Sequence, residues 1–518
     1  MKKFYITTPI YYVNDVPHIG HLYTTVMADI MARWKRLNGF DVFFLTGTDE
    51  HGAKLINTIH STDMDVLQSF CNKMSAKFKT TWDLLNISYT DFIRTTEYRH
   101  CITVNSIVES LFKKGFLFSK EYTGLYCVGC ERFYTIKDLD ENQCCVFHKN
   151  KLILQSEKNY FFKLSYFKDK LLERITNSKH KEYINIQPEE RKKEIIGKLH
   201  LGLEDISLSR TRTNVNWGIP IPFDETQTVY VWIDALINYI SGIGYSNDRN
   251  KFKHYWPVDI HFMAKDILWF HAVIWPAILM GLGYPLPKKI FSHGFFTLNG
   301  YKMSKSLNNV IYPQDLVNKY GVDATRYLII NIIPFNTDGN ISYLDLTLKY
   351  NTDLANNLGN LFFRIIKMIE KYFNLDLPYV KKPNILLAQK ISRYFKINFC
   401  NNINELKFQK ALTILQQGLT FINKQIEIDS PWVLHKHNRT NINMCLSSYL
   451  QAIAVVALHI LPFMPTVSQT IWKTICAKDN IDNVATKYFT NNNVIPEGGF
   501  LPIKGKISMI NIIFPRLV

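Results

Sequence analysis

The 518-residue sequence has a modest share of charged residues and lacks a long uninterrupted apolar run. Charged residues make up 20% and hydrophobic residues 47% of the chain, a balance that argues against intrinsic disorder. The longest apolar stretch, Ile267 to Gly283, contains His271 and Pro276 and is too short to cross a bilayer. We therefore expect a globular protein of several domains without a membrane-spanning segment.

Targeting and common nucleotide-binding signals are also missing. Met1-Lys2-Lys3 begins like a secretory leader, but polar residues from Thr7 onward interrupt the apolar part and no cleavage site follows. No Walker loop or internal repeat is present, and Gly242-Ile243-Gly244 is only a fragment of a dinucleotide fingerprint. We therefore expect a cytoplasmic protein that binds nucleotides, if at all, in another way.

The nine cysteines do not have the pattern of a disulfide framework. Four lie between Cys127 and Cys145 and the others are scattered, which fits metal binding in a reducing compartment. Cys127 and Cys130 have C-x₂-C spacing, and Cys145 and His148 have C-x₂-H spacing. Such arms predict a zinc knuckle with one structural zinc ion per chain. Cys144 is an alternative to Cys145, and buried reduced thiols are the alternative to a metal site.

The residues that are abundant point to an acidic partner. The net charge is +17, and nucleic acid is the commonest acidic partner of a soluble protein. One basic loop, Tyr301-Lys302-Met303-Ser304-Lys305-Ser306, follows the turn residue Gly300. Its two lysines are three residues apart and would neutralise a polyphosphate. A solvated basic loop is the alternative interpretation.

A second distinctive stretch is Pro17-His18-Ile19-Gly20-His21. A buried strand is expected before it, at 3–8, and a helix after it, ending near Gly39. His18 and His21 would then face the same way on a first helical turn, where backbone N–H groups and the helix dipole favour a phosphate. Gly20 has no Cβ, so a flat ring such as adenine could approach the backbone. Two surface histidines are the alternative.

Alternating strands and helices predict an α/β fold. Buried strands are expected at 41–46, 229–233, 259–263 and 289–293, and the polar segment 47–52 follows the first of these, where such folds bind ligands. The cysteine-rich segment would split this Rossmann-like parallel sheet in two. Beyond about residue 345, apolar residues at helical spacing predict an α-helical bundle domain.

The histidine and lysine stretches together resemble the HIGH and KMSKS signatures of class I aminoacyl-tRNA synthetases, and the second is present letter for letter. The resemblance narrows to the methionyl-tRNA synthetase family of the short bacterial type and covers nearly the whole chain. Segments 8–14, 46–52, 230–235 and 265–267 are similar to that family, as is the zinc knuckle. Ala264 departs from it, because the family usually has glycine there.

This resemblance implies an ATP-dependent ligase that joins L-methionine to tRNA(Met) through methionyl-adenylate, releasing AMP and pyrophosphate, for translation initiation and elongation. Mg²⁺ would accompany ATP, and a monomer with no membrane partner is expected. The implied domains are the first half of the catalytic domain at 1–114, the connective insertion with the zinc knuckle at 115–209, the second half of the catalytic domain at 210–295, the KMSKS loop and stem-contact region at 296–345, the α-helical anticodon-binding domain at 346–495 and a C-terminal tail at 496–518.

The resemblance also implies site residues. The alternatives to these roles are ordinary core for the pocket residues, a solvated polar helix face for Asn360 and Arg364, and a buried anchor at a helix start for Trp432. The catalytic residues would be His18, His21, Lys302 and Lys305, and ATP would be bound by these together with Gly20, Asp266 and Ser304. The methionine pocket would comprise Ile10, Tyr12, Asp49, Trp232, Ala235, Leu236, Tyr239, Ile267 and His271, with Asp49 pairing the ammonium group. Anticodon contacts would come from Asn360, Arg364 and Trp432.

Three other functions fit parts of the pattern. A sister synthetase for leucine, isoleucine, valine or cysteine would keep the chemistry, although the insertion at 115–209 is small for a separate editing domain. A catalytically silent tRNA-binding protein would keep the scaffold but would not need both intact signatures. A small-molecule nucleotidyltransferase would leave the helical domain unexplained.

Overall fold

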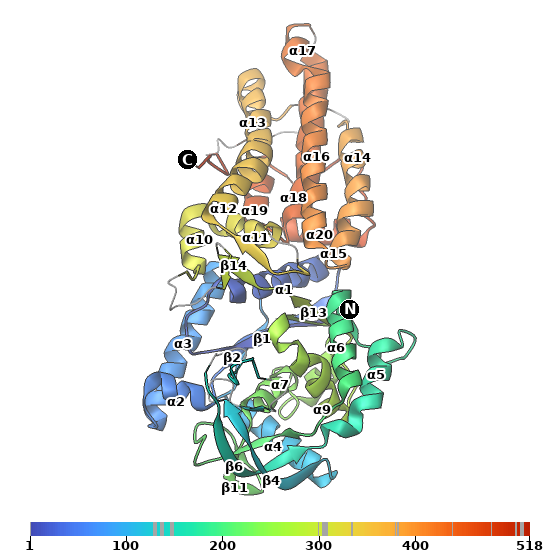
Figure 1. Ribbon diagram of the computed structural model, residues 1–518. Coiled ribbons are helices and arrows are strands. Elements are labelled where there is room, and N and C mark those ends of the chain that lie inside the picture. Colours follow the sequence, from blue (N-terminus) through green and yellow to red (C-terminus); the bar gives the residue numbers. More distant parts are fainter. Residues whose placement is uncertain are drawn as a thin grey trace. The chain divides into compact units, whose positions relative to one another are not determined.

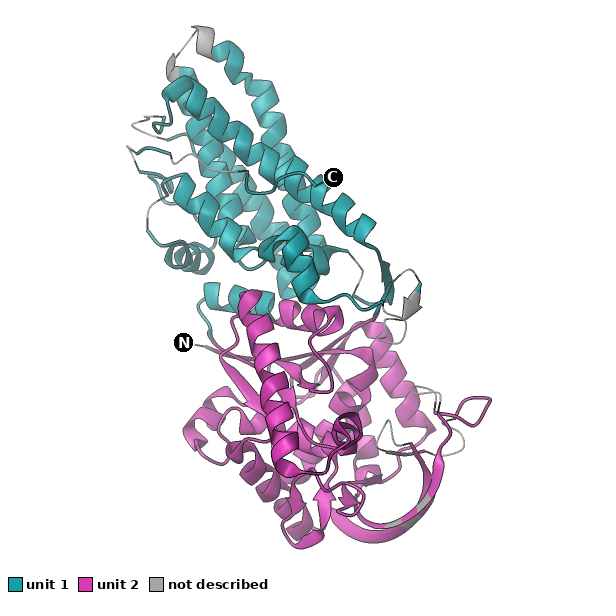
Figure 2. Cartoon of the chain, turned by 90° about the vertical axis from the view of Figure 1, so that its left-hand side faces the viewer, with its two compact units in different colours: residues 1–2, 29–41, 296–518 teal, residues 3–28, 42–295 magenta. Residues whose placement is uncertain are grey.

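The computed structural model describes residues 2–127, 132–134, 139–145, 150–298, 300–302, 309–332, 335–378, 380, 383–437, 439–477, 479–502, 505–507 and 512–517. The chain divides into two compact units (Figure 2). We call Lys3–Ala28 with Val42–Phe295 the sheet unit, and Met1–Lys2, Asp29–Asp41 and Phe296–Val518 the helical unit.

The sheet unit is built on a six-stranded sheet with the order β3-β2-β1-β12-β13-β7. Figure 1 labels β1, β2 and β13 of this sheet. The strands are β1 (Lys3–Tyr12), β2 (Asp41–Asp49), β3 (Asp91–Arg94), β7 (Asn185–Gln187), β12 (Ile260–Ala264) and β13 (Lys289–His293). The pairs β1–β12, β12–β13, β13–β7 and β2–β3 are parallel. The predicted α/β class with a Rossmann-like parallel sheet is confirmed.

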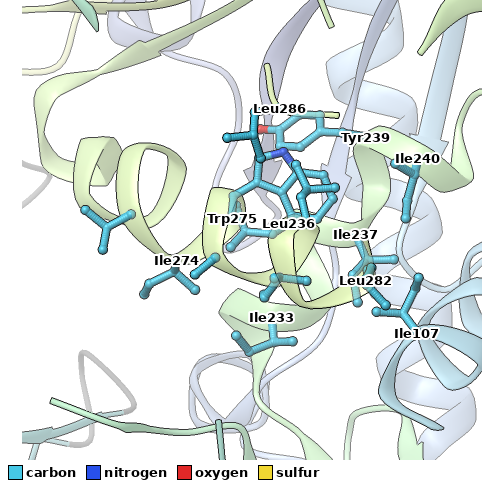
Figure 3. Packing of buried hydrophobic residues seen from close by; sticks show 14 of the residues in the cluster. Ile107, Ile233, Leu236, Ile237, Tyr239, Ile240, Ile274, Trp275, Leu282 and Leu286 are labelled. Atoms are coloured by element: carbon cyan, nitrogen blue, oxygen red, sulfur yellow. The ribbon is translucent and has the colours of Figure 1, made fainter. Parts of the chain in front are cut away.

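Helices pack on both faces of this sheet. Thr24 of α1 (Ile19–Leu37) contacts His293 of β13, whereas Tyr239 of α7 (Val231–Ser241) packs on His261 of β12. His293 pairs with Ala264, three residues beyond His261, so the two histidines point to opposite faces. Helices α1 and α7 therefore lie on opposite sides of the sheet. The α7 side is a large apolar core, part of which Figure 3 shows around Trp275.

The other helices of the sheet unit are α2 (Ala53–Ile59), α3 (Met64–Leu84), α4 (Tyr98–Lys113), α5 (Lys168–Thr176), α6 (Glu189–Leu201), α8 (Arg249–Tyr255) and α9 (Trp275–Leu282). A π-helix, Phe270–Ile274, leads directly into α9. Single π-helical turns are often found at functional sites.

The predicted insertion forms a sheet of its own but also contributes to the main one. Strands β4 (Leu117–Cys127), β5 (Arg132–Tyr134), β6 (Ile153–Phe162) and β8 (Ile206–Ser207) pair antiparallel in the order β5-β4-β6-β8. Strand β7 lies between them in sequence, yet it forms the edge of the main sheet, where Ile186 pairs with Ile290. The bounds 115–209 stay a prediction.

The prediction of a strand at 229–233 is wrong. Strand β11 (Asp224–Val229) ends at the first of these residues and α7 begins at Val231. Strand β11 belongs to a small antiparallel sheet with β9 (Ser209–Thr211) and β10 (Pro220–Ile221). Valine and isoleucine favour strands, but α7 is buried at every residue from Ile233 to Ser241, so packing in the core outweighs that preference.

The helical unit begins with a three-stranded sheet and continues as a helical bundle. The sheet contains β14 (Phe296–Leu298), β15 (Tyr301–Lys302) and β16 (Gly339–Ile341). The helices are α10 (Pro313–Tyr320), α11 (Val322–Asn331), α12 (Tyr343–Lys349), α13 (Asn360–Phe373), α14 (Leu386–Phe395), α15 (Asn401–Asn404), α16 (Phe408–Asp429), α17 (Pro431–His437), α18 (Arg439–Ile460), α19 (Pro465–Thr474) and α20 (Ile481–Thr490). The predicted helical domain is confirmed.

Helix α18 is the central helix of this bundle and packs against α13, α14 and α16. Its segment Asn441–Ile460 is long and apolar enough to cross a membrane by composition, and it is the one such helix found in the described part of the chain. In its most apolar window, 83% of the residues are buried inside the protein. A core helix of a globular bundle accounts for this pattern.

Candidate functional site

The predicted substrate-binding residues of the sheet unit lie near the carboxyl edge of its sheet. Strands β1, β2 and β12 end at Tyr12, Asp49 and Ala264, and parallel strands end at the same edge. Asp49 is 9% exposed, and its carbonyl accepts a hydrogen bond from Val13. Asp266 follows β12 in a short turn and its side chain is exposed. These residues therefore lie near the edge where α/β folds bind ligands, and their role in binding stays a prediction.

His18 and His21 stack on each other at the start of α1, with ring centroids 3.8 Å apart. Nδ1 of His18 accepts a hydrogen bond from the Gly20 N–H at 3.1 Å, and Nδ1 of His21 accepts one from the His18 N–H at 3.2 Å. A neutral ring held in this way carries its proton on Nε2. Burial lowers the pKa of His18 and, more strongly, the pKa of His21. Both rings are therefore neutral hydrogen-bond donors near pH 7.

The position of the His18 ring leaves no room for a side chain at residue 20, so glycine is required there. A Cβ on residue 20 would lie 2.9 Å from Cε1 and 3.1 Å from Nδ1 of His18, so any larger residue would displace that ring. The sequence predicts a different reason for this glycine, the close approach of adenine. That approach stays a prediction, while the contact with His18 is an additional reason for the missing side chain.

The predicted methionine pocket brings α7 and the π-helix Phe270–Ile274 together. The Tyr239 hydroxyl lies 2.7 Å from Nε2 of His271, and Nδ1 of His271 lies 2.9 Å from the Ile267 carbonyl. Nδ1 must donate to that carbonyl, so Nε2 of the neutral ring accepts from Tyr239. Burial lowers the pKa of His271 to about 4, which keeps the ring neutral. Tyr239 is thereby held as an acceptor, because its only hydroxyl hydrogen is already used.

The other predicted pocket residues differ in burial. Ala235, Leu236, Tyr239 and His271 are buried, whereas Ile10, Tyr12, Trp232 and Ile267 are half-buried. Figure 3 shows Leu236 and Tyr239 on the same helix, directed towards Trp275 in the apolar core. The half-buried members are the ones that can still contact a ligand over a large area.

Phe270 was not predicted, although it packs directly on a pocket residue. Its ring stacks on that of Trp232, with centroids 3.9 Å apart and an angle of 11° between the planes. Phe270 lies between the predicted residues Ile267 and His271, which is the signal that could have identified it. The stack fixes Trp232 as an aromatic wall, and such walls make favourable contacts with a thioether sulfur.

The lysine loop is only partly described. Lys302 lies in β15, where its backbone pairs with Thr297 of β14. Ser304 and Lys305 lie outside the described residues, so their predicted placement is untested. The structure therefore supports a hairpin leading into the loop and leaves the lysine positions as predictions.

The predicted zinc knuckle is also partly described. Cys127 and Cys145 are buried in one small cluster with Tyr134, and Leu139 and Leu152 pack against it. Cys130 and His148 lie outside the described residues. No group of three metal-ligating side chains occurs among the residues described, which include two of the four predicted ligands.

Cys145 fits the third ligand position better than Cys144. Cys145 shares its apolar cluster with Cys127, whereas Cys144 is half-buried and its thiol contacts the Asn142 carbonyl at 3.6 Å. Two thiols gathered in one cluster match the donor type of a structural zinc site. The residues present therefore fit the metal.

In the helical unit, two of the three predicted anticodon residues touch. The Arg364 guanidinium carbon lies 5.4 Å from the ring centroid of Trp432, and Nη2 of Arg364 lies 2.7 Å from Oε1 of Glu427. Trp432 is 39% exposed and Arg364 is 31% exposed as a side chain. Asn360 is exposed one helical turn before Arg364 on α13. Glu427 was not predicted as part of this surface, but its carboxylate pairs with Arg364.

Comparisons with known proteins agree with this arrangement. The family described as "tRNA synthetases class I (M)" matches residues 4–141 and 136–366. Methionine--tRNA ligase of Caldanaerobacter subterraneus is 40% identical over 531 aligned residues, covering 100% of this chain and 79% of that protein. The Thermotoga maritima enzyme of the same name is 41% identical, covering 93% of this chain and 77% of that protein.

Solved structures give the same result. Mycobacterium tuberculosis methionyl-tRNA synthetase in complex with methionyl-adenylate superposes with a TM-score of 0.90 at 33% identity, over 100% of both chains. The apo form of that enzyme superposes with a TM-score of 0.84 at 30% identity, over 100% of this chain and 99% of that one. The similarity thus extends over the sheet unit and the helical unit alike.

Proposed function

Because this chain belongs to the methionyl-tRNA synthetases, the methionine–tRNA ligases of class I, we propose that the carboxyl-edge site activates methionine with ATP. A methionine carboxylate oxygen attacks the α-phosphorus, and the bond to pyrophosphate breaks. A hydroxyl of the terminal adenosine of tRNA(Met) then attacks the methionyl carbonyl, and AMP leaves. The product serves translation initiation and elongation.

The two neutral histidines carry this proposal. With Nδ1 of His18 and His21 occupied by backbone N–H groups, Nε2 of each ring carries a hydrogen, and these hydrogens would bind oxygens of the α-phosphate as charge shifts onto them. Donors fixed in advance stabilise the transition state without reorganisation. In this role they are electrostatic groups, and no proton transfer is assigned to them.

Other residues would hold the nucleotide. Asp266 would bind the ribose beside Gly20, and Lys302 and Lys305 would hold the β- and γ-phosphates with Ser304. Mg²⁺ bound to ATP would neutralise phosphate charge.

Methionine would be recognised at both ends. Asp49 would pair with the ammonium group, and the thioether would lie among Tyr12, Ile10, Trp232 and the Tyr239–His271 pair. Since Tyr239 donates to His271, it offers an unshared electron pair rather than a hydrogen to the ligand. A hydroxylated or charged side chain would lose its hydration in this apolar surrounding without full compensation, so the pocket favours a soft, uncharged one.

The zinc site would be structural. Cys127, Cys130, Cys145 and His148 would hold one ion and link the ends of the hairpins in the insertion. Among the described residues there, Cys127, Tyr134 and Cys145 form a small apolar cluster. Elemental analysis of protein purified without chelators should give about one zinc per chain. A zinc-free, folded protein would eliminate this assignment.

The surface formed by Asn360, Arg364 and Trp432 would bind the anticodon of tRNA(Met). An exposed tryptophan is a platform for base stacking, and Arg364 supplies charge beside it. Cytoplasmic location, the absence of a membrane partner and a monomeric state remain predictions. Sedimentation of the purified enzyme would test the last of these.

The decisive experiment is ATP–pyrophosphate exchange with each amino acid in turn, without tRNA. Methionine should drive exchange far above all others. Exchange driven by leucine, isoleucine, valine or cysteine would reject the pocket assignment. No exchange in folded protein would instead favour a silent tRNA-binding role.

A further inference from the structure

A buried carboxylate connects three parts of the sheet unit beside the proposed methionine site. Asp234 on α7 is 1% exposed. Its Oδ2 lies 2.7 Å from Nδ1 of His51, and its Oδ1 lies 2.6 Å from Nε2 of His100. His100 in turn places Nδ1 2.7 Å from the Ser241 hydroxyl. One carboxylate therefore joins the segment after β2, the first turn of α4, and α7.

The segment after β2 is anchored at two consecutive residues, Glu50 and His51. Glu50 receives two hydrogen bonds from Arg94, at 2.7 and 2.9 Å, and its carbonyl accepts from the Trp217 indole. His51, the next residue, is held by Asp234. Asp49 directly precedes these two anchored residues, so its position depends on both anchors.

The other end of the connection is the helix that lines the pocket. Asp234 lies between Trp232 and Ala235 on α7, and Tyr239 lies further along the same helix. A bond from Asp234 to His51 therefore sets the spacing between Asp49 and the aromatic side of the pocket. We infer that Asp234 is a positioning residue that fixes the length of the methionine site between its ammonium-binding and thioether-binding ends. This inference rests on the proposed function.

The electrostatics of Asp234 support a carboxylate rather than an amide at this position. Burial alone would raise its pKa, but the charges and hydrogen bonds of His51 and His100 outweigh burial and lower the pKa to about 2. The group stays ionised and accepts with both oxygens. An asparagine has one acceptor oxygen and one donor nitrogen, so one imidazole would lose its partner in a dry environment.

A matched control exists at the opposite edge of the same sheet. Asp259, just before β12, is paired with Lys3 at 3.0 Å and Lys288 at 2.7 Å. It is also largely buried and holds two cations, but it lies at the amino ends of the strands, away from the proposed site. Asp259→Asn therefore reports what losing a structural carboxylate does by itself.

The test is the KM for methionine and the KM for ATP in pyrophosphate exchange, measured for wild type, Asp234→Asn and Asp259→Asn. We expect Asp234→Asn to raise the methionine KM roughly tenfold or more, with ATP KM and kcat within about threefold of wild type. Asp259→Asn should leave both KM values unchanged. Equal methionine KM values for the two variants would overturn the inference.

A second pair of variants decides the matter if Asp234→Asn does not fold. His51→Asn keeps a donor close to the position of Nδ1, whereas His51→Ala removes it. His51→Ala should raise the methionine KM, and His51→Asn should keep it close to the wild-type value. Equal KM values for these two variants would also overturn the inference. Absence of methionine-dependent exchange in the wild type would instead reject the proposed function itself.

Discussion

The two units differ in where their candidate residues lie. In the sheet unit, Tyr239 and His271 are each 2% exposed and are bonded to each other. In the helical unit, Trp432 is 39% exposed and contacts Arg364 at the surface. The first arrangement is a hydrogen-bonded pair in the interior, which would suit a small substrate that must be surrounded. The second is an open platform, which suits a large partner that brings its own surface.

The units also differ in how they use charge. Burial lowers the pKa of His18, His21 and His271, so these rings act as neutral donors and acceptors in surroundings of low polarity. Arg364 is 31% exposed as a side chain and pairs with Glu427. Interactions of the first kind are weakly screened by salt, and those of the second kind are strongly screened. Substitutions in the interior site should therefore have larger effects.

The largest effect is expected for His21→Ala. Removing a fixed donor to a developing oxyanion typically costs about 10²–10³-fold in rate, so pyrophosphate exchange should fall by that factor. The exposed His200→Ala on α6 is the control and should be unaffected. A loss below about tenfold would mean that His21 serves mainly in packing against Tyr11 and Phe78.

Trp432→Ala should separate the two units functionally. Stacking of a base on an exposed aromatic ring is worth about 1–3 kcal/mol, so kcat/KM for tRNA aminoacylation should fall by roughly 5–150-fold. Pyrophosphate exchange should not change, because it needs no tRNA. Val433→Ala, at the next residue, is the matched control. Equal losses in both assays would show that Trp432 supports the fold rather than tRNA binding.

Burial, rather than membership of a unit, should decide the response to pH. His459 of the helical unit is fully buried, and burial lowers its pKa from 6.5 to about 4. Between pH 4 and pH 6.5 the unfolded chain binds more protons at His459 than the folded chain does. The contribution of His459 to stability is therefore complete above pH 6.5 and is lost as the pH falls towards 4. At pH 5 the loss is about 2 kcal/mol relative to pH 7.

This contribution can be isolated by urea unfolding at pH 7 and pH 5. Since His459 contacts the Val455 carbonyl through Nδ1, His459→Asn can keep that hydrogen bond without the titration. The wild type should lose about 2 kcal/mol more between the two pH values than the variant. The exposed His200→Asn should behave as wild type. An identical loss in His459→Asn would contradict the prediction.

Local sequence was sufficient for the main strands and for the family. β13 has the predicted bounds, Lys289–His293, and α1 runs from Ile19 to Leu37 as the apolar spacing indicates. These elements have consistent periodicity and clear end signals. Strand β7 could not be predicted from the sequence, because three residues are too few to show a periodicity. Its place in the sheet comes from pairing with β13.

Contacts between distant residues were beyond the sequence pattern. The Trp232–Phe270 stack, the Asp234–His100 bond and the Arg364–Glu427 pair each join separate elements. Gly20 was identified as important, yet the imidazole of His18 that excludes a side chain there depends on a particular rotamer. The sequence thus predicted the candidate segments, and folding determined which neighbours contact them.

The smallest effect is expected at the surface pair itself. Glu427 is 60% exposed, and a surface ion pair contributes about 0–1 kcal/mol, so Glu427→Gln should barely change stability. RNA binding should tighten by up to roughly fivefold at low salt, because Arg364 is released and a negative charge near the phosphates is removed. Glu405→Gln, similarly exposed and paired with Lys407, is the control. The increase in RNA affinity should disappear at about 0.5 M salt. An increase that persisted there would mean that Glu427 affects RNA binding through the shape of its side chain rather than through its charge.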